Sequence, residues 1–204
     1  MFVYLIQGIG YGFAAAVQPG PFQTYLISQT LTKGWRKALP AAFAPLISDG
    51  PIICVALLVL NQIPIWFERI LYVASGLFIL YLAYKASMAW RNFNGSYEGG
   101  DSSVKQGLIR AVMVNAMSPG PYIYWGLVTG PILLAGWREA LVNGLGFLIS
   151  FYATIILSLS AIIVVFGTAR LLGPKVNHTM LGVSAIALIG FGFYQLWIGI
   201  TCNP

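Results

Sequence analysis

Two copies of the tripeptide Pro-Gly-Pro lie inside strongly apolar stretches of this chain, at residues 19–21 and 119–121. Proline has no backbone N–H and clashes with the preceding turn, so neither copy fits within an uninterrupted helix. In a membrane, a broken helix is tolerated only where the break is buried in protein or lines a polar cavity. We therefore expect two broken membrane helices, one in each half of the chain, as in secondary transporters.

The composition supports a membrane protein. The chain has 204 residues, of which 58% are hydrophobic and only 8% are charged, whereas soluble domains average about 25% charged residues. The formal net charge is +6, but the basic residues are spread over short loops, where they set the orientation of a protein in the bilayer. We therefore expect the protein to lie in a lipid bilayer and not to bind nucleic acid.

Six apolar stretches approach or exceed the roughly 20 residues that a membrane helix needs. The expected spans are residues 2–31, 38–60, 66–90, 107–135, 140–166 and 180–200. The first and fourth contain the Pro-Gly-Pro breaks, and a polar segment separates the third from the fourth. The prediction is an all-α membrane protein with a single domain, residues 1–204, built from three-helix repeats at 1–90 and 107–204 and a cytoplasmic loop at 91–106.

The two halves share short blocks of sequence in the same order. The matches are Pro19-Gly20-Pro21-Phe22 with Pro119-Gly120-Pro121-Tyr122, Gly34-Trp35-Arg36-Lys37-Ala38-Leu39 with Gly136-Trp137-Arg138-Glu139-Ala140-Leu141, and Leu46-Ile47-Ser48 with Leu148-Ile149-Ser150. Three spans in each half place the second half upside down relative to the first. This predicts an inverted 3+3 repeat of six transmembrane helices, in which helices 1 and 4 are broken.

The basic residues predict the orientation of the chain. If the N-terminus lies outside, the inner loops carry Lys33, Arg36, Lys37, Lys85, Arg91, Lys105, Arg110, Arg170 and Lys175, and the outer loops carry only Arg69 and Arg138. Cytoplasmic loops hold the excess of Lys and Arg in membrane proteins. We therefore expect both termini on the periplasmic or extracellular side.

Each break predicts a binding surface made of backbone groups. Pro19 and Pro21 deprive the carbonyls of Ala15 and Val17 of their helical partners, and the second copy does the same in the fourth span. The half-helix after each break presents free N–H groups and a positive dipole end, which suit an anion. The freed carbonyls can receive an ammonium group or a coupling cation. A carboxylate on the N–H groups and an ammonium on the carbonyls make an amino acid the expected ligand. The candidate substrate-binding residues are Gln18, Pro19, Gly20, Pro21, Asn115, Pro119, Gly120, Pro121 and Tyr122.

Several of these side chains have a second interpretation. Gln18 and Asn115 can either orient a substrate or cap an interrupted helix. Tyr122, Tyr124 and Trp125 follow the second break and can line the pathway, although ordinary core packing is the preferred interpretation for these aromatic residues.

Asp49 is the acidic residue placed within a predicted span, about twelve residues into the second. A charge at that depth costs at least about 2.5–3.5 kcal/mol on insertion scales, so its side chain should face a cavity. We expect it to couple transport to protons or to bind a substrate ammonium; the alternative is a structural carboxyl that holds the helices together. Its counterpart in the second repeat is Phe151, so the site should be asymmetric.

The sequence contains no constellation for catalysis. A nucleophile–base pair is absent, and His, Cys and acidic residues do not cluster in the spans, so we expect no enzyme, no metal site and no cofactor.

The sequence resembles the LysE family of amino-acid exporters. The resemblance lies in Gly8-x-x-x-Gly12, in the first Pro-Gly-Pro with the following Lys33-Gly34-Trp35-Arg36-Lys37-Ala38, in Asp49, and in the Asn-x-x-x-Pro-x-Pro pattern that begins at Asn115. The pattern departs from the family at Ser48, which replaces a glycine, and at Ala116 and Met117, which replace a common Pro-Lys pair. The resemblance implies secondary active export of amino acids or similar small metabolites across the bacterial inner membrane, driven by protons or ions. A non-transporting membrane subunit or scaffold and a cation or metal exporter are the alternatives, and a homodimer is plausible.

Overall fold

The computed structural model describes residues 1–58, 65–93, 103–169 and 173–201, and every regular element among them is helical. The elements are α1 (Phe2–Val17), α2 (Pro21–Lys33), α3 (Trp35–Ala38), the 3₁₀ helix η1 (Leu39–Phe43), α4 (Ala44–Leu58), α5 (Ile65–Arg91), α6 (Val104–Met117), α7 (Pro119–Ile123), the π-helix η2 (Tyr124–Thr129), α8 (Gly130–Glu139), α9 (Leu141–Ala169) and α10 (Pro174–Thr201). The all-α prediction is therefore confirmed for the described residues. Most of the expected loop at 91–106 lies outside them.

Four helical stretches in the described residues are long and apolar enough to cross a membrane. They are Trp35–Val55, Tyr72–Arg91, Leu141–Thr168 and Pro174–Thr201. These stretches correspond to the second, third, fifth and sixth expected spans. The first and fourth expected spans are interrupted and are not among these stretches, so the count of six spans stays a prediction.

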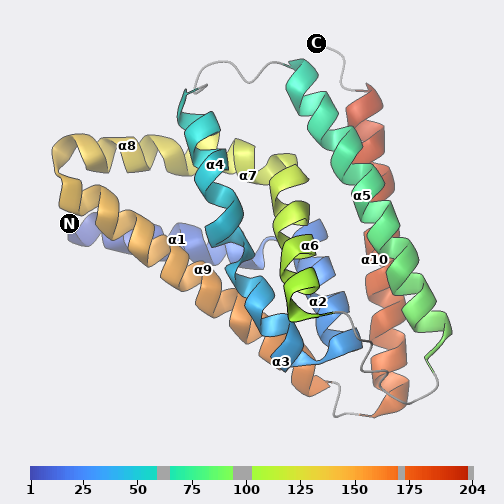
Figure 1. The fold of residues 1–204 in the computed structure, drawn as a ribbon. Coiled ribbons are helices and arrows are strands. Elements are labelled where there is room, and N and C mark those ends of the chain that lie inside the picture. The colour runs from blue at the N-terminus through green and yellow to red at the C-terminus, as the bar shows by residue number, and fades with distance from the viewer. Residues whose placement is uncertain (59–64, 94–102, 170–172, 202–204) are drawn as a thin grey trace.

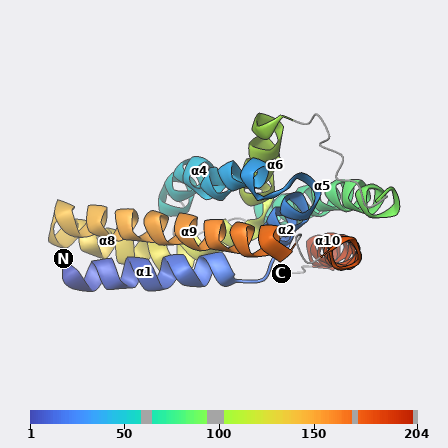
Figure 2. The same ribbon diagram turned by 90° about the horizontal axis from the view of Figure 1, so that it is seen from below.

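The helices form two groups on either side of a central set. Figures 1 and 2 show α1, α8 and α9 lying together on one side, while α5 and α10 run alongside each other on the other side. Between these groups lie α2, α4 and α6. Ser75 of α5 donates a hydrogen bond to Gln195 of α10, which joins the second group internally. Each helix break joins this central set, because α2 follows the first break and α6 precedes the second.

Glycines allow α1 and α9 to approach closely. A Cβ atom on Gly12 would lie 2.5 Å from the carbonyl oxygen of Phe151, and one on Gly8 would lie 2.6 Å from the carbonyl oxygen of Phe147. Real Cβ atoms do not come this close to backbone, and small residues at such spacing let membrane helices pack tightly. The Gly8-x-x-x-Gly12 pattern therefore marks the α1–α9 contact.

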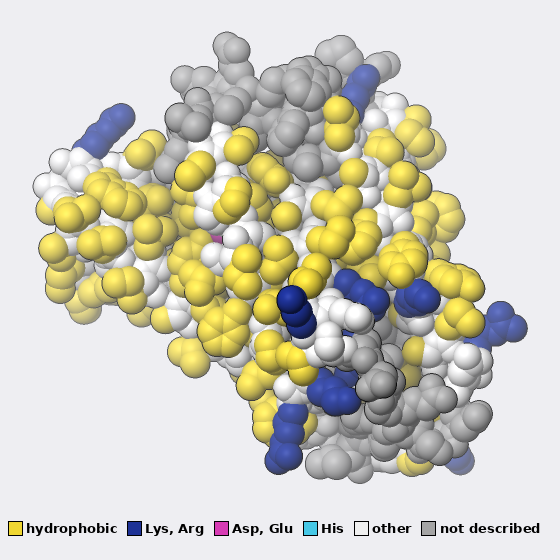
Figure 3. All heavy atoms as spheres, viewed as in Figure 1, with side chains coloured by type: hydrophobic (Ala, Val, Ile, Leu, Met, Phe, Trp, Pro, Cys, Tyr) yellow, Lys and Arg dark blue, Asp and Glu magenta, His cyan; other side chains and the backbone are white. Residues whose placement is uncertain are grey.

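Basic side chains gather at one end of the molecule. The end that Figure 3 shows at the bottom carries most of the dark blue side chains, and Figure 1 places there α3, the C-terminal end of α5 and the N-terminal ends of α6 and α10. These elements carry Arg36, Lys37, Lys85, Arg91, Lys105, Arg110 and Lys175, and Lys33 ends the neighbouring α2. Arg170 lies outside the described residues. We call this surface the basic end.

Candidate functional site

The first break interrupts the helix at Gln18, Pro19 and Gly20. Gln18 ends α1 with an extended ψ of 118°, Gly20 is fully extended, and α2 begins at Pro21. Proline suits this first helical position because its N–H would have no partner there in any case. The first break therefore lies where the sequence places it.

The carbonyls freed by the first break have a partner that the sequence argument did not foresee. The side-chain amide of Gln23 donates to the carbonyl oxygens of Ala15, at 3.1 Å, and Ala16, at 3.3 Å. An apolar stretch offers few other donors, so this amide acts as an internal cap. The Ala15 carbonyl therefore already has one donor, and its binding of a substrate ammonium stays a prediction.

The second break differs from the first in its position. The helix α6 ends at Met117, the extended residue is Ser118 (ψ 134°), and α7 already begins at Pro119. The Pro-Gly-Pro is thus the first turn of the new helix instead of the gap before it. Because Pro119 and Pro121 both lack an N–H, only Gly120 offers a free donor among the first three positions. This helix start is a poorer anion site than that of α2.

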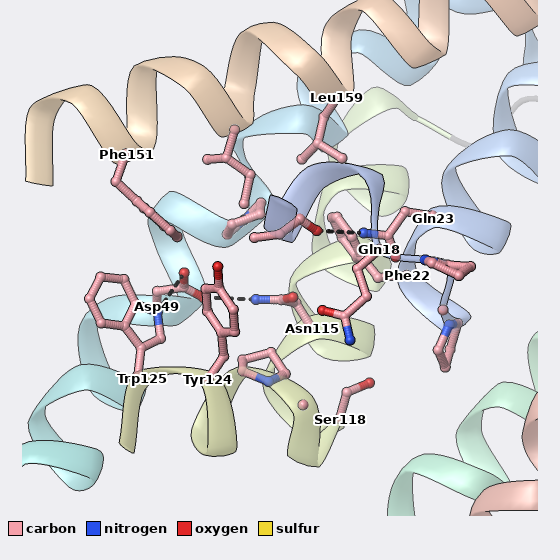
Figure 4. A pocket seen from close by; sticks show the side chains of 18 of the residues that line it. Gln18, Phe22, Gln23, Asp49, Asn115, Ser118, Tyr124, Trp125, Phe151 and Leu159 are labelled. Carbon is pink, nitrogen blue, oxygen red and sulfur yellow. Dashed lines mark hydrogen bonds between the residues drawn. The ribbon is translucent and has the colours of Figure 1, made fainter. Parts of the chain in front are cut away.

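Both breaks line the same central cavity, which has a volume of about 180 Å³. Pro19, Gly20 and Pro21 reach it from one side, and Gly120 and Pro121 reach it from the other. The residues that surround it are shown in Figure 4. Segments a hundred residues apart are thus brought to one cavity. We call it the central cavity.

Asp49 lies on α4 at the edge of the central cavity and is only 3% exposed. Three side chains donate to its carboxylate: Asn115 Nδ2 to Oδ1 at 2.8 Å, Trp125 Nε1 to Oδ2 at 3.1 Å and Tyr152 OH to Oδ2 at 3.4 Å. Asn115 also donates to Ser48 Oγ at 2.8 Å. A buried carboxylate needs such donors, because an unpaired charge away from water is strongly unfavourable.

The donors to Asp49 come from three different helical segments. Asn115 lies on α6, Trp125 on the π-helix η2 and Tyr152 on α9. π-helical turns are rare and are often found at functional sites, and this one places the Trp125 indole N–H against the carboxylate. The preferred sequence interpretation of Trp125 was core packing, and the side chain is fully buried, yet it also binds Asp49.

Most of the residues singled out from the sequence surround the central cavity. Those that line it are Gln18, Pro19, Gly20, Pro21, Asp49, Asn115, Gly120 and Pro121. Pro119 is buried and does not line the cavity, and Tyr122 instead donates its hydroxyl to the carbonyl of Ala116, at 2.9 Å, across the second break. The role of each in substrate binding stays a prediction.

Sequence reasoning missed Gln23, Ser118, Tyr152 and Gln195. Gln23, Ser118 and Gln195 line the central cavity, and Tyr152 binds Asp49. Gln23 carried a usable signal, since a polar amide two residues after a break within an apolar stretch is a natural cap. Ser118 is the extended residue at the second break, directly before Pro119. Tyr152 and Gln195 are ordinary polar residues on helices, and nothing in the local sequence separates them from structural ones.

The walls of the central cavity differ in chemistry. Asp49 supplies a carboxylate, and no Lys, Arg or His is among the described residues that line the cavity. The first-turn N–H groups of Phe22 and Gln23 precede any acceptor within α2, whose positive dipole end favours an anionic group. Phe151, which the sequence alignment of the two halves pairs with Asp49, adds an aromatic wall and packs edge-on against Trp125 with ring centroids 5.1 Å apart. The cavity therefore presents an acidic group and an anion-binding backbone to the same small space.

A comparison with known protein families finds one match that covers most of the chain. The family described as LysE type translocator matches residues 13–198. No curated protein sequence and no solved structure matches the chain significantly. The matched range contains both breaks, Asp49 and all of the hydrogen-bonding partners of its carboxylate.

Proposed function

Because this chain belongs to the LysE type translocator family, we propose that it is a secondary active transporter that exports amino acids or similar small metabolites across the bacterial inner membrane. Protons or another ion supply the driving force. The observation that carries the proposal is the central cavity, where two helix breaks meet one buried carboxylate. A membrane scaffold has no need of such a cavity.

The contacts between helices support an inverted 3+3 repeat of six membrane segments. In that arrangement α1 and α2 correspond to α6 and to the continuous helix formed by α7, η2 and α8, while α4 corresponds to α9. A two-fold axis in the membrane plane then exchanges the α1–α9 contact with the α6–α4 contact, and both pairs are present. The α5–α10 pair maps onto itself. Binding at the interface of such repeats is the common arrangement in secondary transporters.

The chemistry of the central cavity favours a zwitterionic substrate. The substrate carboxylate binds the N–H groups of Phe22 and Gln23 at the start of α2, where the helix dipole adds to the attraction. The substrate ammonium binds Asp49, the acidic residue that lines the cavity. This assignment predicts that amino acids bind more tightly than their methyl esters or amides, which lack the carboxylate.

Asp49 also couples transport to the proton gradient in this proposal. A proton and a substrate ammonium compete for the same carboxylate, so release of one accompanies binding of the other. Asn115, Trp125 and Tyr152 hold the carboxylate in place in the absence of substrate. An intramembrane acid that faces a cavity is a frequent element of proton relays.

The basic end faces the cytoplasm in this proposal, and both termini lie on the outer side. The excess of Lys and Arg at that end matches the charge bias of cytoplasmic loops. The basic side chains on the other side of the membrane are Arg69 and Arg138, which lie near the start of α5 and the end of α8. Labelling of single cysteines at residues 36 and 138 with a membrane-impermeant reagent, in intact and in opened cells, measures this orientation directly.

The decisive experiment is transport in proteoliposomes, with Asp49→Asn compared to the wild type. Counterflow of a panel of amino acids identifies the substrate, and an imposed pH gradient then measures coupled flux. The matched control is Glu139→Gln, because Glu139 also accepts hydrogen bonds from neighbours, Tyr4 at 2.8 Å and Asn143 at 3.2 Å, but lies outside the central cavity.

The expected result is loss of pH-driven flux in Asp49→Asn and normal flux in Glu139→Gln. If counterflow survives in Asp49→Asn, the carboxylate couples protons; if counterflow is lost as well, it also binds the ammonium. Unchanged pH-driven flux in a folded Asp49→Asn protein removes the coupling role. Absence of counterflow for every compound in wild-type proteoliposomes removes the transport proposal itself.

A further inference from the structure

A second cavity, separate from the central one, lies between α2, α5, α6 and α10. Its volume is about 170 Å³, and three cationic side chains line it: Lys33 at the end of α2, Lys85 on α5 and Arg110 on α6. All three belong to the basic end, where Figure 3 shows the dark blue side chains gathered. We call it the basic cavity.

The cations of the basic cavity have no acidic partner in the described part of the chain. No carboxylate is among the residues that line the cavity, and no ion pair joins Lys33, Lys85 or Arg110 to any described residue. Lys33 experiences the positive charges of Arg110 and Lys37 instead. Lys33 and Arg110 are partly buried and Lys85 is exposed. Like charges held near one another repel, so an anion that enters between them is attracted by all of them.

Gln29 supplies an independent indication of a ligand. Its side chain is 4% exposed and lines the basic cavity, and its Oε1 atom has no hydrogen-bond partner. Its amide nitrogen lies against Gly107 of α6, where a Cβ atom would displace it. Buried polar atoms are normally paired, so this oxygen is suited to a hydroxyl or amine donor on a bound molecule.

The rest of the basic cavity is mixed: Tyr25, Ser28 and Thr32 of α2 add hydroxyl groups, and the other side chains are apolar. Leu82, Ala86 and Ala89 of α5 and Leu188 of α10 contribute this part of the wall. Nearby residues on the same helices, Tyr84 and Met88, are exposed and face the surroundings of the protein. The cations attract an anionic group, and the apolar part of the wall suits an apolar part of the same ligand.

We propose that the basic cavity binds the phosphate group of an anionic phospholipid such as phosphatidylglycerol. Lys33, Lys85 and Arg110 hold the phosphate, Gln29 accepts a hydrogen bond from a headgroup hydroxyl, and the glycerol and first acyl carbons lie against the apolar wall. Basic pockets between membrane helices at the headgroup level are known to bind anionic lipids. The site is independent of the transported substrate, since it shares no lining residue with the central cavity.

The test measures thermal unfolding of the full-length detergent-purified protein with soluble short-chain lipids. The probes are dihexanoyl phosphatidylglycerol, dihexanoyl phosphatidylcholine and sodium phosphate, each titrated over the same range. Variants Arg110→Gln and Lys85→Gln remove one cation each from the basic cavity. Lys175→Gln is the matched control, because it removes the same charge from the basic end without lining the cavity.

The expected result is that phosphatidylglycerol raises the unfolding midpoint with an affinity at least tenfold higher than that of phosphatidylcholine, since a ligand that binds only the folded state stabilises it. The affinity falls about tenfold in Arg110→Gln and Lys85→Gln and stays within twofold of wild type in Lys175→Gln. Equal protection by both lipids, or an equal loss in Lys175→Gln, overturns the proposal. Equal protection by phosphate alone overturns the lipid assignment and assigns the cavity to free phosphate.

Discussion

Replacing Gln23 by methionine removes the amide that caps the first helix break while keeping the length of the side chain. The amide donates to the carbonyls of Ala15 and Ala16 at 3.1 and 3.3 Å. A hydrogen bond of this kind contributes about 0.5–1.5 kcal/mol net, and a buried carbonyl left without a partner costs about 1–3 kcal/mol. The side chain is only partly buried and both bonds are long, so we take the lower part of these ranges.

The expected loss of stability for Gln23→Met is about 2 kcal/mol for the two bonds together. In a chain of this size each kcal/mol lowers the unfolding midpoint by about 2–4 °C, which gives about 4–8 °C. Gln23→Glu should lower it further, because a carboxylate placed against two carbonyl oxygens is repelled. Thermal unfolding of the purified protein in detergent, followed by tryptophan fluorescence, measures both variants.

The matched control for this prediction is Gln106→Met. Gln106 lies exposed in the first turn of α6, and its backbone N–H, not its side chain, takes part in the helix cap with Ser103. Its substitution should change stability by less than about 0.5 kcal/mol. If Gln23→Met is as stable as the control, the freed carbonyls do not depend on this amide, and the account of how the break is stabilised is wrong.

Two further predictions concern helix packing and the surroundings of the carboxylate. Gly12→Ala should destabilise the protein by about 1–3 kcal/mol through overpacking against the Phe151 backbone. At Gly10 a Cβ atom meets nothing within 4 Å, so Gly10→Ala should be neutral or stabilising by up to about 1 kcal/mol. Equal unfolding midpoints of the two variants in detergent refute the close α1–α9 contact. Trp125→Phe removes the 3.1 Å hydrogen bond to Asp49. It should lower the free energy of unfolding by about 1–3 kcal/mol, because the acceptor is charged. An unaltered unfolding midpoint and unaltered pH-driven flux in proteoliposomes show that the indole N–H is dispensable.

The positions of the helix breaks could be predicted because their cause is local. Pro19 and Pro21 exclude a continuous helix whatever surrounds them, and the structure ends α1 and begins α2 around them. The second copy shows the limit of that reasoning. Proline is equally compatible with a gap and with the first turn of a helix, and the chain adopts the second arrangement at Pro119, with the break at Ser118.

The partners of Asp49 could not be predicted from sequence. Trp125 and Tyr152 are 76 and 103 residues away along the chain, and the π-helical turn that holds Trp125 has no sequence signature that separates it from an α-helix. Asn115 was singled out because it precedes a break, yet its bond to Asp49 depends on how α4 packs against α6. Hydrogen bonds between distant residues follow from packing, which local patterns do not encode.

Composition and the two proline motifs by themselves determined a helical membrane protein with two interrupted segments, an acid buried within a span and a basic end. The reason is that hydropathy, proline geometry and the cost of burying charge act on each segment separately. Only the tertiary structure decided that both interruptions meet in the central cavity, that Gln23 donates to carbonyls of the first of them, and that three cations line one cavity with Gln29. Those outcomes depend on which surfaces of distant helices come into contact, and that choice is made by the packing of the whole chain.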